Sequence, residues 1–172
     1  PYLNNELGVL QYLKKDYISA ENYFKRATEL SMNWAIPWSN LCLVYKDKDE
    51  VDNAIQAGNK AENLQNDLQL TKVALGMLYE KEKNYMLAEE YYREAIQLNQ
   101  RYYLPFERLG NIYLNTTKYS LADSFFFEAE VRKKGLNYVG NNAHNLATML
   151  PLPFQTPLIC TLDTTKRLED DV

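Results

Sequence analysis

The stretch LGMLYEKEKNYMLAEEYYREA, residues 75–95, decides the fold because related stretches recur along the chain. They begin at Leu7, Leu41 and Leu109, so the pattern returns every 34 residues without an insertion. The four repeats are residues 1–34, 35–68, 69–102 and 103–136. Two alanine positions are kept in every repeat: Ala20, Ala54, Ala88 and Ala122, and then Ala27, Ala61, Ala95 and Ala129. A period of this length over four consecutive copies predicts supersecondary units that stack on their neighbours.

Each repeat predicts two short amphipathic helices joined by a tight turn. Apolar residues are spaced by three or four positions, as on one face of a helix. The first repeat shows this spacing in two groups, Leu3, Leu7 and Leu10, and then Ala20, Phe24 and Ala27. We expect helices at 2–15, 18–31, 36–48, 50–64, 70–82, 85–98, 104–116 and 119–133. Short polar side chains are expected to cap the second helix of each repeat, namely Asp16, Asp49, Asn84 and Thr117.

Three further positions recur, and together with the alanines they form a known pattern. They are a Leu-Gly pair in three of the repeats, a tyrosine at Tyr45, Tyr79 and Tyr113, and an aromatic ring at Phe24, Tyr92 and Phe126. The pattern resembles the tetratricopeptide repeat family over about residues 1–136. The resemblance implies an all-α solenoid, a right-handed superhelix whose first helices line a concave groove for extended peptides or partner helices. The second repeat departs from the pattern, with Cys42 in place of the glycine and Gly58 in place of the ring.

Equivalent positions of successive repeats would assemble the groove, because each repeat contacts only its neighbours. We take the second, fifth, ninth and twelfth residues of each repeat as inward-facing, which gives a mixed but largely apolar surface. The residues that we expect to bind a peptide are Tyr12, Leu43, Lys46, Val73, Met77, Glu80, Glu107, Asn111 and Leu114. The alternative is that many inward positions, above all the second and ninth, pack between repeats. An exposed apolar surface favours a protein or extended peptide partner of apolar or amphipathic character.

One subset of the resembled family grips a C-terminal carboxylate with lysine, asparagine and arginine. The matching positions here hold Asn5, Val9, Asn40, Leu70 and Ala74, so only Asn40 agrees. Without cationic donors the strong charge-assisted hydrogen bonds of such a site are missing. A carboxylate clamp is therefore not expected.

Composition restricts the classes of partner. The 172 residues carry a formal net charge of -4 with a pI of about 5.1, which argues against nucleic-acid binding. No apolar run approaches the roughly 18 to 20 residues that span a bilayer, so we expect a soluble chain without a membrane span. The sequence begins with Pro1 and not Met, which suggests an excerpt or a processed product. Localisation stays open between the cytoplasm, which is slightly favoured, and export with the signal removed.

The residues that could suggest catalysis have simpler interpretations. His144 is the only histidine and has no second strong ligand at helical spacing, so no metal site is expected. Cys42 occupies the small-residue position of its repeat, where sulfur acts as a compact apolar group. The sequence contains no glycine-rich phosphate loop and no nucleophile elbow. We therefore expect no cofactor and no enzymatic activity.

The end of the chain departs from the repeat pattern. We expect a capping helix at 137–149 that covers the apolar end of the array, and an extended, proline-interrupted apolar tail at 150–172. The tail could bind its own array or a neighbouring copy, or it could be the start of a further domain.

These features together predict a non-catalytic scaffold or adaptor that binds a protein or peptide. The alternatives are a helical accessory or regulatory domain of a larger enzyme or signalling protein, and self-association through the tail.

Overall fold

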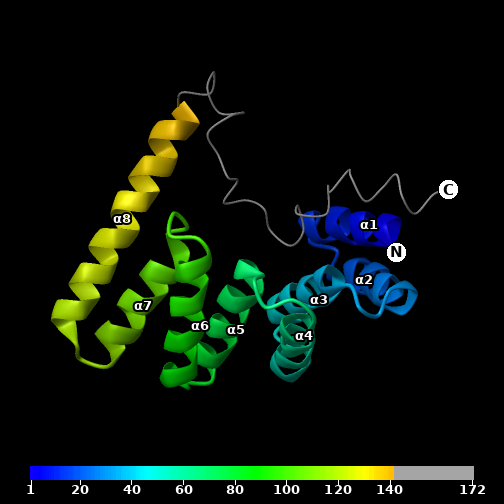
Figure 1. Ribbon diagram of the computed structural model, residues 1–172, viewed down its shortest axis with the longest axis horizontal. Coiled ribbons are helices and arrows are strands. Elements are labelled where there is room, and N and C mark those ends of the chain that lie inside the picture. Colours follow the sequence, from blue (N-terminus) through cyan, green and yellow to red (C-terminus); the bar gives the residue numbers. More distant parts are fainter. Residues whose placement is uncertain (142–172) are drawn as a thin grey trace. The chain divides into compact units, whose positions relative to one another are not determined.

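A computed structural model describes residues 1–141, and within them it contains eight α-helices and no strand (Figure 1). The first helices of the four repeats are α1 (Tyr2–Leu13), α3 (Ala35–Asp47), α5 (Gln69–Lys81) and α7 (Leu104–Asn115). The second helices are α2 (Tyr17–Leu30), α4 (Val51–Leu64), α6 (Tyr85–Leu98) and α8 (Tyr119–Asn141). The first seven helices begin and end within two residues of the positions predicted from the repeat. The expectation of an all-α fold is confirmed.

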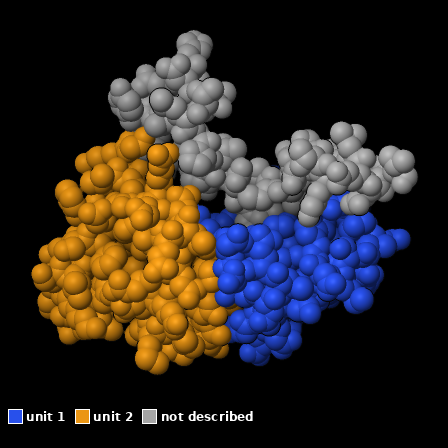
Figure 2. Space-filling model, viewed as in Figure 1, with its two compact units in different colours: residues 1–71, 154–172 blue, residues 72–153 orange. Residues whose placement is uncertain are grey.

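The chain divides into two compact units, residues 1–71 and 72–141 of the described part (Figure 2). In the first unit α1 packs on α2, α2 on α3 and α3 on α4. In the second unit α6 packs on α7 and α7 on α8, while Val73 of α5 joins the core formed with Tyr92 and Leu109. Each unit therefore buries its apolar faces between consecutive helices. Among the described helices, none is both long and apolar enough to cross a bilayer.

The last helix is longer than predicted. Helix α8 continues to Asn141, so residues 137–141 extend it and do not begin a separate capping helix. The sequence at the expected break, Lys134-Gly135-Leu136, contains no proline. A single exposed glycine costs a helix only about 1 kcal/mol relative to alanine, which is too little to end it. The rest of the predicted capping helix, 142–149, and the tail 150–172 lie outside the described residues.

Within three of the hairpins an aromatic ring lies directly on a glycine. A Cβ atom added to Gly8 would lie 2.6 Å from the ring of Phe24, and one added to Gly76 would lie 2.6 Å from Tyr92. Gly110 stands in the same relation to Phe126, at 2.7 Å. In the second repeat the small residue is on the other helix. Cys42 stands at the glycine position of the first helix, Gly58 stands at the ring position of the second helix, and both are buried. Three hairpins thus combine a glycine and an aromatic ring where their helices approach each other.

All four first helices end with the same backbone motif. The residues Lys15, Asp49, Lys83 and Thr117, which are 34 positions apart, have φ angles of 63°, 68°, 62° and 60°. In each case the next N–H donates to the carbonyl five residues earlier: Asp16 to Gln11, Glu50 to Tyr45, Asn84 to Tyr79 and Lys118 to Tyr113, at 2.8–2.9 Å. These bonds define a Schellman motif, whose left-handed residue is usually glycine. The sharp turn therefore comes from the backbone, without glycine.

The predicted N-caps are correct in two repeats and wrong in two. Asp16 accepts a hydrogen bond from the Ser19 N–H, and Asn84 accepts one from the Leu87 N–H. Asp49 and Thr117 instead occupy the left-handed position. The reason is a shift of one residue, because the cap position of the second repeat is Glu50. Equivalent residues in all four repeats keep their backbone conformation whatever their side chain.

The close approach at Gly76 predicts a sharp loss of stability when a methyl group is added. Gly76→Ala should lower the free energy of unfolding by about 1–3 kcal/mol, since Tyr92 is fully buried and cannot move aside freely. Gly135→Ala is the matched control, because nothing lies within 4 Å of its added Cβ. It should stabilise the chain by up to about 1 kcal/mol through helix propensity. Urea unfolding of both variants measures the difference, and equal effects would contradict the packing argument.

The left-handed turn residues predict the opposite effect of a glycine. Lys15→Gly should raise the free energy of unfolding by about 1 kcal/mol, because glycine adopts a positive φ without a steric penalty. The neighbouring Lys14→Gly is the control, since Lys14 has a φ of -79° and is equally exposed. It should lower stability by about 0.5–1 kcal/mol. Thermal unfolding followed by circular dichroism would contradict the argument if both variants shifted in the same direction.

Candidate interaction surfaces

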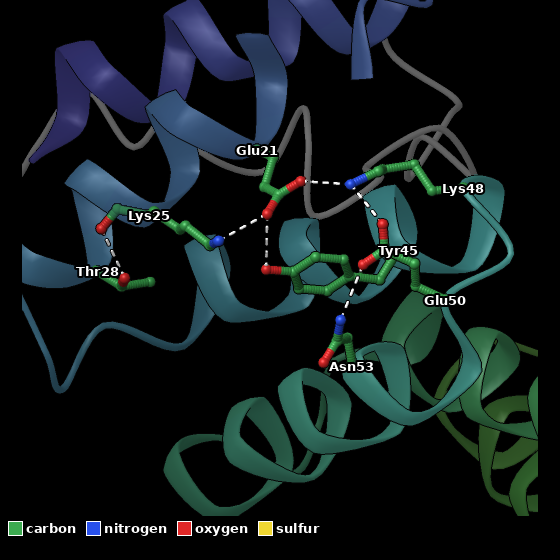
Figure 3. Close-up of polar contacts among 7 residues, drawn as sticks. All are labelled: Glu21, Lys25, Thr28, Tyr45, Lys48, Glu50 and Asn53. Atoms are coloured by element: carbon green, nitrogen blue, oxygen red, sulfur yellow. Dashed lines mark hydrogen bonds and ion pairs between the residues drawn. The ribbon is translucent and has the colours of Figure 1, made fainter. Parts of the chain in front are cut away.

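A carboxylate on a second helix positions the first helix of the next repeat. Glu21 of α2 accepts a hydrogen bond from the Tyr45 hydroxyl at 3.2 Å and forms ion pairs with Lys25 and Lys48, each at 2.6 Å (Figure 3). Tyr45 and Lys48 belong to the end of α3, including its C-cap. Lys48 also pairs with Glu50 at 2.6 Å. This network joins α2 to α3 and fixes the helix that carries the predicted surface residues.

The electrostatics of Glu21 follow from its partners. Burial alone would raise the pKa of the Glu21 carboxyl, but the hydrogen bonds and positive charges of Lys25 and Lys48 outweigh it and hold the pKa below its ordinary value. The Tyr45 pKa is raised by burial and by the nearby carboxylate. Glu21 is therefore ionised and Tyr45 is a neutral hydrogen-bond donor near neutral pH.

The second compact unit contains the same arrangement 68 residues later. Tyr113 of α7 donates to Glu89 of α6 at 2.6 Å, and Arg93 contacts both, at 2.9 Å from Glu89 and 2.7 Å from the Tyr113 hydroxyl. The sequence pattern had not led us to predict either of these two networks. The available signal was the recurrence of a glutamate followed four residues later by a basic residue, at Glu21 and Glu89. The second repeat has Ile55 at this position and cannot make the same contact.

In the first unit, α1 and α3 meet at a polar cluster that includes two of the predicted surface residues. The Tyr12 hydroxyl donates to Asp47 at 2.5 Å, and Lys46 pairs with the same carboxylate at 2.5 Å. Burial and the hydrogen bond to Asp47 raise the Tyr12 pKa, so this tyrosine stays protonated. Leu43, one turn earlier on α3, is half-buried. The structure thus brings Tyr12 and Lys46 together through Asp47, which the sequence had not indicated.

In the second unit the predicted residues lie on α5 and α7. Glu80 accepts a hydrogen bond from Tyr92 at 2.7 Å, and Glu107 pairs with Lys133 at 2.9 Å. Both carboxylates therefore have partners within the chain. Met77 and Asn111 are half-buried, and Leu114 is 46% exposed. Apolar side chains and internally paired charges share this surface.

Some inward positions pack between repeats, as the alternative interpretation proposed. Val73 is only 3% exposed and belongs to the core of the second unit, so it offers no surface to a ligand. At the fifth position of earlier repeats, Asn5 accepts from Asn40 at 2.9 Å and Ser39 bonds to Thr71 at 2.6 Å. All four polar side chains are fully buried. Asn40, which matched the carboxylate clamp, is therefore committed to the core.

The structure also describes the candidate catalytic cysteine. Cys42 is fully buried, and burial raises the pKa of its thiol to about 12. A thiol in this state is not a nucleophile near neutral pH. Within residues 1–141 no group of three or more His, Cys, Asp or Glu side chains is placed to hold a metal ion. His144 lies outside the described residues.

The repeat pattern matches a known family. Residues 71–102 match the family model for the tetratricopeptide repeat, and this segment coincides with the third repeat of the sequence. The matched segment, residues 71–102, is a tetratricopeptide repeat. A repeat scaffold of this kind supports protein interaction in general. None of the curated protein sequences matches the chain.

Solved structures share the fold of this chain. A crystal structure of MamA is 19% identical with a TM-score of 0.72, covering 78% of this chain and 79% of MamA. The pilF protein of Pseudomonas aeruginosa is 21% identical with a TM-score of 0.71, covering 77% of this chain and 60% of pilF. A chain of the APC/C hetero-tetramer Cut9–Hcn1 is 24% identical with a TM-score of 0.68, covering 74% of this chain and 24% of that chain. At these identities the likeness shows the fold alone.

The Glu21 network predicts a pH-dependent contribution to stability. Glu21→Gln should lower the free energy of unfolding by about 2 kcal/mol at pH 7, because Lys25 and Lys48 lose their charged acceptor. A depressed folded-state pKa stabilises the chain above the unfolded pKa of about 4.3, and this contribution is lost as the pH falls through the folded value. The difference in the free energy of unfolding between the wild type and Glu21→Gln should therefore disappear at acidic pH. Glu29→Gln, at an exposed position of α2, is the control; a gap that stays constant with pH would contradict the assignment.

Proposed function

We propose that this tetratricopeptide-repeat chain is a non-catalytic scaffold that binds a protein segment along its first helices. The observation that supports the proposal is the exposure of apolar side chains on these helices. Leu43 and Met77 are half-buried and Leu114 is 46% exposed. Solvent-exposed apolar groups that cluster among polar ones are typical of interaction surfaces.

The charged neighbours of these apolar residues limit the kind of partner. Asp47 is already paired with Lys46, and Glu107 is already paired with Lys133. A ligand would therefore meet few uncompensated charges on these surfaces. Since long-range attraction depends on net charge, recognition here rests on apolar contact with hydrogen bonds that fix the register. This favours an apolar or amphipathic segment over a strongly charged one.

The similar structures agree with a scaffold role without defining the partner. Cut9–Hcn1 is a hetero-tetramer, so a similar fold takes part in a stable assembly with another protein. We propose the same general role here, as a module that holds a protein partner in place. The proposed binding surface of the first unit consists of Tyr12, Leu43 and Lys46. That of the second unit consists of Met77, Glu80, Glu107, Asn111 and Leu114.

Two leucines of equal exposure provide a direct test. Leu114 on the first helix α7 and Leu121 on the second helix α8 are both 46% exposed. Peptides selected by display on the intact chain should lose about tenfold or more in affinity with Leu114→Lys, because a charge would replace apolar contact area. Leu121→Lys adds the same charge at a matched exposure and should leave the affinity unchanged. Isothermal titration measures both, and a loss confined to Leu121→Lys would place the site on the second helices and contradict the proposal.

A further inference from the structure

A group of large apolar residues is exposed at the turn between α2 and α3 in the first unit. Leu30, the last residue of α2, is 57% exposed, and Met32 in the turn is 70% exposed. Trp34 and Trp38, the only tryptophans of the chain, are half-buried and pack on the same small core. The Trp38 Nε1–H donates to the Met32 carbonyl at 3.4 Å and so connects α3 to the turn. We call Leu30, Met32, Trp34 and Trp38 the tryptophan edge.

The exposure is a property of this turn and not of an end of the array. Asn66 and Gln100 are at the position of Met32 in the two later turns between repeats, and both are exposed. Leu98, at the position of Leu30, is 41% exposed. Each of these residues has a repeat before it and a repeat after it, so a neighbouring repeat leaves the position open.

The equivalent place in the second unit shows which group fits there. Phe106 of α7 is at the position of Trp38, and the guanidinium of Arg132 lies 3.7 Å from the centre of its ring. The Arg132 Nε–H also donates to the carbonyl of Gln100 at 2.5 Å, and Gln100 is at the position of Met32. One arginine thus covers the ring and bonds to the turn at the same time.

The tryptophan edge has the two partners of this contact but not the arginine. The residue at the position of Arg132 is Leu64, which is apolar. Among the described residues no cation lies over the ring of Trp38, although tryptophan attracts a cation more strongly than phenylalanine does. A carbonyl oxygen has two lone pairs, so that of Met32 can accept a second donor besides Trp38. A guanidinium supplied by another molecule would find both partners in place.

The charge of the first unit also favours a cationic partner. Residues 1–71 contain seven lysines and arginines against ten aspartates and glutamates. Glu29 and Asp67, which adjoin Leu30 and the core residue Leu68 in the sequence, are both exposed. Complementary charge of this kind steers an arginine-containing segment toward the surface.

We propose that the tryptophan edge binds a protein segment that presents an arginine among apolar residues. The guanidinium lies over Trp38 and donates to the Met32 carbonyl, as Arg132 does at Phe106 and Gln100, while Leu30 supplies apolar contact. Tryptophan and arginine are both frequent among the residues that carry most of the binding energy of an interface. No residue of the tryptophan edge belongs to the binding surfaces proposed above, so either proposal can fail while the other stands.

The test begins with peptides selected by display on the intact chain, from which those that also bind the Met32→Lys variant are removed. Met32 is exposed, so this variant should fold normally and change only the tryptophan edge. The remaining peptides should contain an arginine among apolar residues, and their titration should change the tryptophan fluorescence, which comes from Trp34 and Trp38 alone. Replacing the arginine by citrulline, which has nearly the same shape without the charge, should lower the affinity at least about tenfold.

A substitution in the first unit can supply the missing arginine from within the chain. Leu64→Arg copies the arrangement of Arg132 and should weaken peptide binding at least about tenfold, because its guanidinium would compete for Trp38. Gln56→Arg, at an exposed position about two turns earlier on α4, makes the same change in net charge and should leave the affinity unchanged. Circular dichroism checks the folding of both variants. If Leu64→Arg does not fold, Leu30→Lys at an exposed position takes its place, since a lysine there would repel the arginine of the peptide.

Several results would overturn the proposal. One is that no selected peptide depends on Met32, and another is that the peptides that depend on it lack arginine. A third is a citrulline peptide that binds as tightly as the arginine peptide. A fourth is an equal effect of Leu64→Arg and Gln56→Arg on the affinity. The last is a tryptophan fluorescence that changes with the concentration of the chain alone, which would indicate that a second copy covers the edge.

Discussion

The structure depends on the close approach of two helices at one point in three of its hairpins. Gly8 and Gly76 give the room, and the rings of Phe24 and Tyr92 fill it, with no space for an added methyl group. Where the second repeat places Cys42 on its first helix, Gly58 stands on the other, and both remain buried. In the three hairpins with a glycine on the first helix, the constraint is therefore the space that an aromatic ring needs on the facing helix. The invariant buried alanines of the second helices follow from the same need for short distances between helices.

The turns meet this constraint through backbone geometry. Four non-glycine residues adopt the left-handed conformation, and each is followed by the same backbone hydrogen bond to the end of the first helix. A non-glycine residue in the left-handed conformation costs some free energy at each turn. The packing of the two helices that the turn connects offsets this cost. Because the turn is set by the backbone, side chains at these positions vary freely, as Lys15 and Asp49 illustrate. The side chains at the turns can therefore differ between repeats while the backbone conformation of the turn stays the same.

Electrostatics then join hairpins and shape the surfaces available to partners. Glu21 and Glu89 each hold the tyrosine of the following repeat, at Tyr45 and Tyr113. The first helices keep most of their charges paired within the chain, which leaves apolar side chains as the groups that a ligand can bury. The contact between a glutamate and the tyrosine of the following repeat thus recurs in both compact units.

The sequence by itself determined the all-α class and the place of nearly every helix, because the 34-residue period recurs in each repeat and the glycine-to-ring pairing recurs in three of them. It could not determine which polar side chains would be buried. Asn40 is fully buried, and Val73, which was expected to bind a peptide, lies in the core. It also missed Asp47, which Tyr12 and Lys46 share, and the continuation of α8 to Asn141. Exposure and pairing depend on helices that are 34 or more residues away in the chain, and only the tertiary structure brings those helices together.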